Sequence, residues 1–240
     1  FITDTATLYK GERENAIKHT IHAYRHGFHF GITGAPFIAV DGLSGTDEAE
    51  VTIDGELHTS VKVAGQILLS DAMVVISHAT GHMGSGIGAA IKNVGMGCAS
   101  RKGKLAQHSS LSPGIGEACI GCGECQEHCS QNAISMVADN AQIDSDACIG
   151  CGECILICPN EAIEVQWNQS IPVFLENMVE YTMGVLANKR KKAFFINFIT
   201  DVSPACDCYP ANDAPIVRNI GVVASTDPVA IDQASVDLVN

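Results

Sequence analysis

The sequence predicts an α/β protein whose largely parallel sheet is interrupted by a small cysteine-rich α+β module. Candidate strands and helices alternate toward both ends of the chain, which is typical of a parallel sheet covered by helices. Eight of the 11 cysteines fall within residues 119–158. Residues 105–188 contain no lysine or arginine but 11 acidic residues, and this window therefore supplies most of the net charge of −13. A change of composition this abrupt indicates a separate module.

The composition excludes several classes of protein. At 240 residues and 25.3 kDa, the chain can bury the core of one large domain or two small ones. Fourteen basic residues against 27 acidic ones argue against nucleic acid and anionic membranes as partners. The apolar runs are too short to span a bilayer, and no signal-peptide pattern opens the chain. We therefore expect a cytoplasmic protein with neither of these partners.

The N-terminal part of the host is expected to alternate strands and helices. The expected strands are 1–3, 36–40, 51–53, 57–63 and 73–77, and the expected helices are 12–26, 64–70 and 86–93. Gly27 ends the first of these helices, because glycine accepts the left-handed backbone of a helix C-terminus. Asp54-Gly55 is a strong hairpin signal between two β-rich runs.

The C-terminal part of the host continues the alternation. We expect a helix at 172–188, strands at 193–198 and 221–224, and a final helix that Asp227-Pro228 opens as N-cap and first-turn proline. Four basic residues at 189–192 suit the negative end of the preceding helix. Since the chain starts with Phe1 and stops inside an apparent helix, we expect the host to be truncated at both ends.

Eight cysteines form two runs with the same spacing, C-x2-C-x2-C-x3-C. Each cysteine of the second run lies 29 residues after its counterpart, and residues 118–134 aligned on 147–163 give 11 identities in 17 positions. The runs are Cys119, Cys122, Cys125 and Cys129, then Cys148, Cys151, Cys154 and Cys158. Zinc ribbons use separated C-x2-C pairs, and disulfide-dense chains are usually short and secreted. The duplication therefore favours two iron–sulfur sites.

The duplicated segment resembles the bacterial two-cluster [4Fe–4S] ferredoxins over about 50 residues. In that pattern three cysteines two residues apart converge on one cubane, and the fourth reaches the other cluster. The resemblance implies a first cluster held by Cys119, Cys122, Cys125 and Cys158, and a second held by Cys148, Cys151, Cys154 and Cys129. Pro159 follows Cys158 as the pattern expects, but Ser130 follows Cys129, which leaves open the rigidity and hydrogen bonding beside that cluster.

We assign residues 113–166 to this ferredoxin-type module and residues 1–112 and 167–240 to a discontinuous α/β host. A module this small with few aromatic residues buries little core, so we expect its folding to depend on metal binding. Thiolates without a bound metal also oxidise. Because the module needs both bound metal and unoxidised cysteines, we expect it in a reducing, anaerobic cytoplasm.

Cysteines and histidines outside the two runs are candidates for a third metal site. They lie in predicted loops and are His78, His82, Cys98, His108, Cys206 and Cys208. Each also has a purely structural interpretation, Cys98 as a small buried hydrophobe and the histidines as loop donors. Separately, the glycine-rich stretch 84–92 would cradle an anion at a helix start, assisted by Lys92 or Lys104, although it lacks the Gly-Lys-Ser/Thr ending of a Walker motif.

Five segments of the chain resemble the uncharacterised Fe–S centre proteins, domain-of-unknown-function family 362. The segments are 1–5, 77–82, 92–101, 206–208 and 224–232. The resemblance covers essentially all residues, including the position of the inserted module, and implies a longer N-terminal part that completes the sheet. It carries no established substrate and no catalytic residues.

The leading functional hypothesis is electron transfer by two [4Fe–4S] clusters, with the host docking a redox partner or a ligand. The acidic window would then face a partner with a basic docking surface. The first alternative is an iron–sulfur oxidoreductase with a substrate or third metal beside His78, Cys98, Cys206 and Cys208. The second alternative is a non-redox regulatory or assembly protein.

Overall fold

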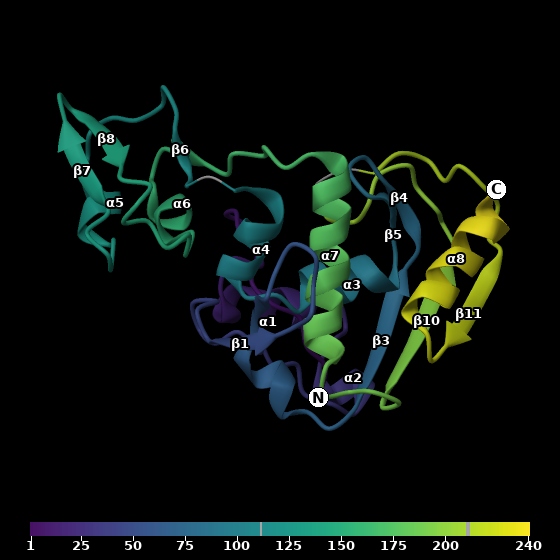
Figure 1. The fold of residues 1–240 in the computed structure, drawn as a ribbon. Helices are drawn as coiled ribbons and strands as arrows, with labels where there is room; N and C mark the ends of the chain where they lie inside the picture. Colours follow the sequence, from purple (N-terminus) through teal and green to yellow (C-terminus); the bar gives the residue numbers. More distant parts are fainter. Residues whose placement is uncertain (111, 210–211) are drawn as a thin grey trace. The chain divides into compact units, whose positions relative to one another are not determined.

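The structure, a computed structural model, describes residues 1–110, 112–209 and 212–240 and separates into two compact units. The first unit comprises Phe1–Ala49, Ala64–Gln66 and Ser100–Gln169, and the second comprises Glu50–Val63, Ile67–Ala99 and Ser170–Asn240. Both can be followed by residue colour in Figure 1. The predicted module 113–166 falls within the first unit, together with much of the N-terminal part of the predicted host.

The first unit begins with sparse regular structure. Its elements before the module are α1 (Ala16–Arg25), α2 (Phe30–Thr33) and α4 (Arg101–His108). Helix α1 starts later than expected because Asn15 caps it, accepting a hydrogen bond from the Lys18 amide. The expected strands 1–3 and 36–40 are reduced to one isolated parallel bridge between Ile2 and Phe37. Three elements continue across the unit boundary, β1 (Glu48–Thr52), β2 (Ser60–Ala64) and the 3₁₀ helix η1 (Gly65–Leu69).

The module repeats a helix followed by a strand. Its elements are β6 (Gly114–Ile115), α5 (Glu124–Glu127), β7 (Ile134–Val137), β8 (Asn140–Ile143), α6 (Glu153–Ile157) and β9 (Ile163–Glu164). Strand β6 pairs antiparallel with β9, and β7 pairs antiparallel with β8 across a turn at residues 138–139. The core of the module includes Leu8 and Leu105 from outside it. A module of this size buries too little apolar surface alone, and these two leucines extend its core.

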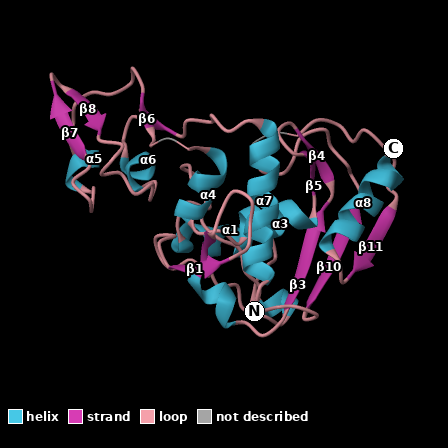
Figure 2. Ribbon diagram, in the orientation of Figure 1, coloured by secondary structure: helices cyan, strands magenta, loops and turns pink. Residues whose placement is uncertain are grey.

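The second unit is built on a three-stranded sheet in the order β11-β10-β3. Figure 2 shows these strands as the long arrows of this unit. The elements of the unit are β3 (Met73–His78), β4 (Thr80–His82), β5 (Gly86–Gly88), α3 (Ala90–Gly97), α7 (Ile171–Leu186), β10 (Ala193–Ile199), β11 (Gly221–Ser225) and α8 (Pro228–Val239).

This sheet is mixed, so the prediction of a largely parallel sheet applies only to one pair of strands. Strand β10 runs parallel to β3, with Phe195 opposite Val75, but antiparallel to β11, with Ile196 opposite Ala224. A parallel pair needs a long crossover, usually helical. Helix α7 lies between β3 and β10 in the chain, whereas residues 200–220 contain no helix in their described part, and the chain returns antiparallel.

Helices pack on the sheet and on each other through close backbone approaches. Helix α3 contacts β3 and α7, and α8 contacts β10 and β11. A Cβ atom on Gly95 would lie 2.3 Å from the Met178 carbonyl oxygen, so only glycine lets α3 approach α7 this closely. The expected helix 86–93 begins later, at Ala90, because residues 86–88 pair with β4 as strand β5.

Lys189 departs from the expected role of the basic residues 189–192. Its side chain is buried, and Nζ donates to the Ile67 carbonyl oxygen and to Asn188 Oδ1, each at 2.8 Å. Burial lowers the pKa of Lys189. Lys189 therefore links the end of α7 to η1 within the second unit, and its ammonium group is buried. Within the described ranges, no helix combines the length and hydropathy needed to cross a membrane.

Candidate functional site

Four cysteines line a partly open hollow in the first unit. Three come from the first run, Cys119, Cys122 and Cys125, and the fourth is Cys158 from the second run. The rest of the wall is mainly apolar, with Met136 and Ile163 among its residues. The fold thus groups three cysteines that are neighbours in sequence with one that is 33 or more residues away (158 − 125 = 33).

A second hollow repeats this arrangement with the runs exchanged. Its cysteines are Cys148, Cys151 and Cys154 from the second run and Cys129 from the first. The rest of the wall combines apolar side chains, including Ile134 and Ile143, with polar ones such as Glu153. None of the eleven cysteines of the chain is in a disulfide bond, so all eight sulfurs are free to become the thiolates that bind a metal.

Glycines shape the backbone around both hollows. Gly121, Gly123, Gly150 and Gly152 have φ values of 67°, 82°, 70° and 72°. These left-handed conformations are costly for residues with a Cβ and turn the chain tightly between the cysteines. At Gly121 a Cβ would also lie 2.5 Å from the Asp139 carbonyl oxygen. Because the glycines of both runs have similar conformations, the backbone turns in the same way beside each hollow.

The fourth cysteine of each run accepts an N–H···S hydrogen bond from the residue four positions on. Ala133 N lies 3.3 Å from Cys129 Sγ, and Ala162 N lies 3.2 Å from Cys158 Sγ. The two bonds are equivalent although Ser130 replaces proline in the first run. The change to Ser130 therefore leaves this hydrogen bond in place, and hydrogen bonds to sulfur are one factor that sets cluster potential.

Burial and neighbouring thiols hold Cys125 and Cys154 in the neutral form. Burial, followed by the nearby Cys151 and Cys148, raises the pKa of Cys154 to about 12, and burial raises the pKa of Cys125. Thiols become metal ligands as thiolates, and a bound cation supplies the charge that favours this. Four sulfurs around an apolar hollow fit an iron–sulfur cubane, whose known ligands are cysteine thiolates.

Two cationic side chains of the first unit reach the module. Arg101, on α4, is 1% exposed; its Nη1 donates to Glu153 Oε2 at 3.1 Å and its Nη2 to the Glu14 carbonyl oxygen at 2.6 Å. Its charge also acts on Cys151, a lining residue of the second hollow. Lys10 Nζ donates to the carbonyl oxygen of Cys158. Each of the two cysteine-lined hollows therefore has a positively charged side chain near one of its cysteines.

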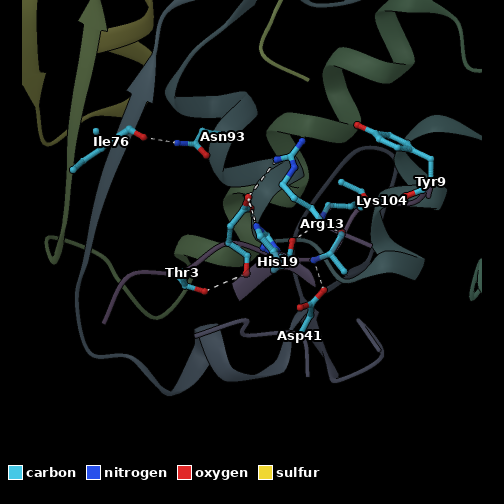
Figure 3. A network of polar contacts seen from close by, with 12 residues as sticks. Thr3, Tyr9, Arg13, His19, Asp41, Ile76, Asn93 and Lys104 are labelled. Atoms are coloured by element: carbon cyan, nitrogen blue, oxygen red, sulfur yellow. Dashed lines mark hydrogen bonds and ion pairs between the residues drawn. The ribbon is translucent and has the colours of Figure 1, made fainter. Parts of the chain in front are cut away.

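Another polar network in the first unit lies around Asp4 and Asp41, both of which follow predicted strands (Figure 3). Asp4 Oδ2 is 3.4 Å from His19 Nε2, and Asp41 Oδ2 accepts from the Ala6 amide at 2.7 Å. Lys104, one of the two predicted anion-binding lysines, donates to the Ala6 carbonyl oxygen at 2.8 Å and to Thr5 Oγ1. These contacts hold residues 4–6 in place. The Lys104 ammonium group belongs to this network and not to an anion site at 84–92.

The other predicted anion-binding lysine, Lys92, faces sulfur in the second unit. Its Nζ lies 3.3 Å from Cys206 Sγ and 3.5 Å from Cys208 Sγ. The start of the predicted anion-binding helix is also occupied, because the Asp232 carboxylate accepts from the Ala90 amide at 2.8 Å and the Ile91 amide at 2.9 Å. A carboxylate of the chain itself thus fills the cradle predicted at 84–92.

The candidates for a third metal site are only partly brought together. His78 is held by Asp207, with 2.8 Å between Nδ1 and Oδ2, and by the Thr200 carbonyl oxygen at 2.7 Å. Burial alone would lower the pKa of His78, but these two contacts raise it overall. His82 Nδ1 instead accepts from the Gly84 and Ser85 amides, so this histidine acts as a loop acceptor.

Cys98 and His108 have separate surroundings. Cys98 ends α3 as its C-cap residue, and the His108 ring meets Trp167 in the first unit with ring centroids 4.5 Å apart. Across the described part of the chain, no three His, Cys, Asp or Glu side chains form a group that would hold a single metal ion. The pair Cys206 and Cys208 is the part of the predicted set that remains close together.

Arg101 and Asp232 were not among the residues predicted to matter. The sequence shows Arg101 only as the start of a basic run, but it opens α4, where Ser100 caps the helix by accepting from the Gly103 amide at 3.0 Å. The signal for this cap was the serine directly before the basic run. Nothing local marks Asp232, because all three groups that donate to it lie far away in the sequence.

The fold and the two cysteine-lined hollows together define an α/β protein that carries a duplicated cysteine module. A family model described as a domain of unknown function (DUF362) matches residues 1–237, and the chain belongs to this family.

Similarity to other proteins is limited. No curated protein matches the chain. Among solved structures, the lactate racemase apoprotein from Thermoanaerobacterium thermosaccharolyticum is similar with a TM-score of 0.45 and 13% identity, over 89% of this chain and 36% of that chain. The chain therefore spans about a third of that protein's length, and a likeness this distant carries no argument about activity.

Proposed function

We propose that this chain is an electron-transfer protein that holds two [4Fe–4S] clusters, one at each cysteine-lined hollow. The observation that carries the proposal is the grouping of three cysteines of one run with the last cysteine of the other, in both hollows. Cys119, Cys122, Cys125 and Cys158 would hold one cluster, and Cys148, Cys151, Cys154 and Cys129 the other. Bound clusters supply one-electron chemistry.

The residues around the hollows suit this role. Apolar side chains in both walls limit the access of water to the sulfurs, and the N–H···S bonds at Cys129 and Cys158 would tune the potential of a bound cluster. Cys122 is exposed, so the cluster that it would hold would lie close to the protein surface. Residues 113–166 would form the cluster-binding module, and the remaining residues would form the host that docks a partner or ligand.

The charge of the module indicates the partner. Residues 105–188 carry 11 acidic side chains and no lysine or arginine, so a redox partner with a basic surface would be attracted to it. Screening by salt should slow this association. Clusters exposed in this way are compatible with a reducing, anaerobic cytoplasm, which we propose as the setting.

Metal analysis and spectroscopy test the proposal directly. Protein purified without oxygen should contain about eight irons and eight inorganic sulfides per chain, as two cubanes require. A redox titration followed by electron paramagnetic resonance should give two mutually interacting reduced signals. Iron-free protein would refute both cluster sites. Clusters that cannot be reduced would refute electron transfer and favour a structural or regulatory role.

Arg101→Met should lower the midpoint potential of the cluster beside Cys151 by on the order of tens of millivolts. The reduced cluster carries one more negative charge, and the buried guanidinium that stabilises this charge would be lost. The matched control is Lys102→Met on the same helix, which is more exposed and more strongly screened. Arg101→Lys keeps the charge and should keep most of the potential. Equal shifts for all three variants would contradict the prediction.

A further inference from the structure

Cys206 and Cys208 form a close pair of sulfurs beside an ammonium group in the second unit. Lys92 Nζ lies 3.3 Å from Cys206 Sγ and 3.5 Å from Cys208 Sγ, and the two cysteine side chains hydrogen-bond to each other. Both cysteines are half-buried, so reagents from solvent can reach them. One ammonium group facing two thiols favours a thiolate on one of them.

The backbone around this pair is built for close approach. A Cβ on Gly88 would lie 3.2 Å from Cys206 Sγ, and a Cβ on Gly81 would lie 2.3 Å from the Pro204 carbonyl oxygen. The Gly81 amide also donates to the Ser203 carbonyl oxygen at 2.8 Å. The two glycines therefore let residues 203–206 lie directly against the β4–β5 hairpin.

The residue between the two cysteines is fixed as well. Asp207 Oδ2 is 2.8 Å from His78 Nδ1, and Asp207 Oδ1 accepts from Asn212 Nδ2 at 3.1 Å. With Asp207 held on both carboxylate oxygens, the side chains of its neighbours stay on the side of Lys92. This geometry is independent of the cysteine runs, which belong to the first unit.

We propose that Cys206 and Cys208, with Lys92, form a dithiol site that exchanges with disulfide substrates. The Cys206 thiolate attacks one sulfur of the substrate disulfide, so that a mixed disulfide forms and one substrate thiolate leaves and takes up a proton. Cys208, deprotonated, then attacks Cys206 Sγ and releases the second substrate thiol. Two electrons pass from the protein dithiol to the substrate, which yields a Cys206–Cys208 disulfide and two thiols.

The proposed roles agree with the electrostatics of the pair. The hydrogen bond from Cys208, together with the charge of Lys92, lowers the pKa of Cys206 to about 4. The same shared hydrogen bond raises the pKa of Cys208. Lys92 Nζ also lies closer to Cys206 Sγ than to Cys208 Sγ, so we take Cys206 as the attacking sulfur and Cys208 as the one that retains the proton until the second step.

Tryptic mapping separates this site from all other cysteines. Cleavage after Lys192 and Arg218 gives the peptide 193–218, whose only cysteines are Cys206 and Cys208. The eight cysteines of the two runs fall in the peptide 105–189, and Cys98 falls in 93–101. The full chain, purified without oxygen, is incubated with oxidised glutathione and quenched in acid. The remaining thiols are alkylated, the chain is digested, and the peptide masses are measured by mass spectrometry.

We expect the peptide 193–218 to become lighter by two hydrogens, with release of two reduced glutathiones, and dithiothreitol to reverse this. Cys208→Ser should stop at the mixed disulfide on Cys206, and Cys206→Ser should lose the fast reaction. Lys92→Gln should raise the pH at which alkylation of Cys206 reaches half its maximal rate by about one unit, because the ammonium group that stabilises the thiolate is lost. The control Lys102→Gln should leave that pH unchanged.

Three results would overturn the proposal. The peptide would keep both hydrogens under oxidised glutathione, or Lys92→Gln would leave the pH dependence of Cys206 alkylation unchanged. The third is a stoichiometric metal, beyond the iron of the cubanes, that protects the peptide and is lost in Cys206→Ser, since the pair would then be a metal ligand. None of these results depends on whether the two cysteine-lined hollows carry clusters, because iron content is measured separately.

Discussion

Cys129→Ala should remove about four of the eight irons, and the lost cluster should be the one that Cys148, Cys151 and Cys154 face. Cys129 lies in the first run but lines the second hollow, together with Cys148, Cys151 and Cys154 of the second run. Without the fourth thiolate a cubane keeps three protein ligands and becomes labile. The remaining cluster, at the hollow of Cys158, should keep its iron and its reduced signal.

Paired variants decide between crossed and sequential ligation. If the ligation is crossed, Cys129→Ala combined with Cys148→Ala affects one cluster and should lose no more iron than either change alone. Cys129→Ala combined with Cys119→Ala affects both clusters and should lose about eight irons. Sequential ligation gives the opposite outcome for the two pairs. Cys98→Ala, outside both hollows, is the control and should retain all the iron.

Features set by local chemistry were predictable from the sequence. The final helix begins at Pro228, and the cap is confirmed, because Asp227 Oδ1 accepts from the Val229 and Ala230 amides. Strands β3 and β10 fall within a residue or two of their predicted ranges, since β-branched and aromatic runs of this length have few alternatives. The cysteine runs and their glycines likewise carry their geometry within a few residues.

Features that depend on distant partners were not predictable. A strand was expected at the position of β11, but its antiparallel direction was not. That direction follows from the connection 200–220, whose sequence shows no helical or strand pattern. Lys189 was expected to act at the negative end of its own helix, but it donates to the carbonyl oxygen of Ile67, over 100 residues earlier. The glycines of 84–92 suggested a ligand cradle, yet the ligand of α3 is a carboxylate of the same chain.

Asp232→Ala should be the most destabilising single change in the second unit. The buried carboxylate joins three elements, because it accepts from the Ala90 and Ile91 amides of α3 and from Asn197 Nδ2 of β10, the last at 2.9 Å, while it is itself on α8. Alanine leaves three buried donors without their acceptor. An unsatisfied buried donor costs about 1–3 kcal/mol, so we expect a loss of about 3 kcal/mol or more in the free energy of unfolding.

Asp237→Ala is the matched control on the same helix. Its carboxylate is exposed and accepts from Gln233 Nε2, one turn earlier, so its removal should change the free energy of unfolding by less than about 0.5 kcal/mol. Urea unfolding gives the free energies, and amide hydrogen exchange locates the effect. In Asp232→Ala, protection should fall first at the start of α3, where Ala90 and Ile91 lose their acceptor. Unchanged exchange at these two amides would mean that water replaces the carboxylate without cost, and that Asp232 does not hold α3 to the sheet.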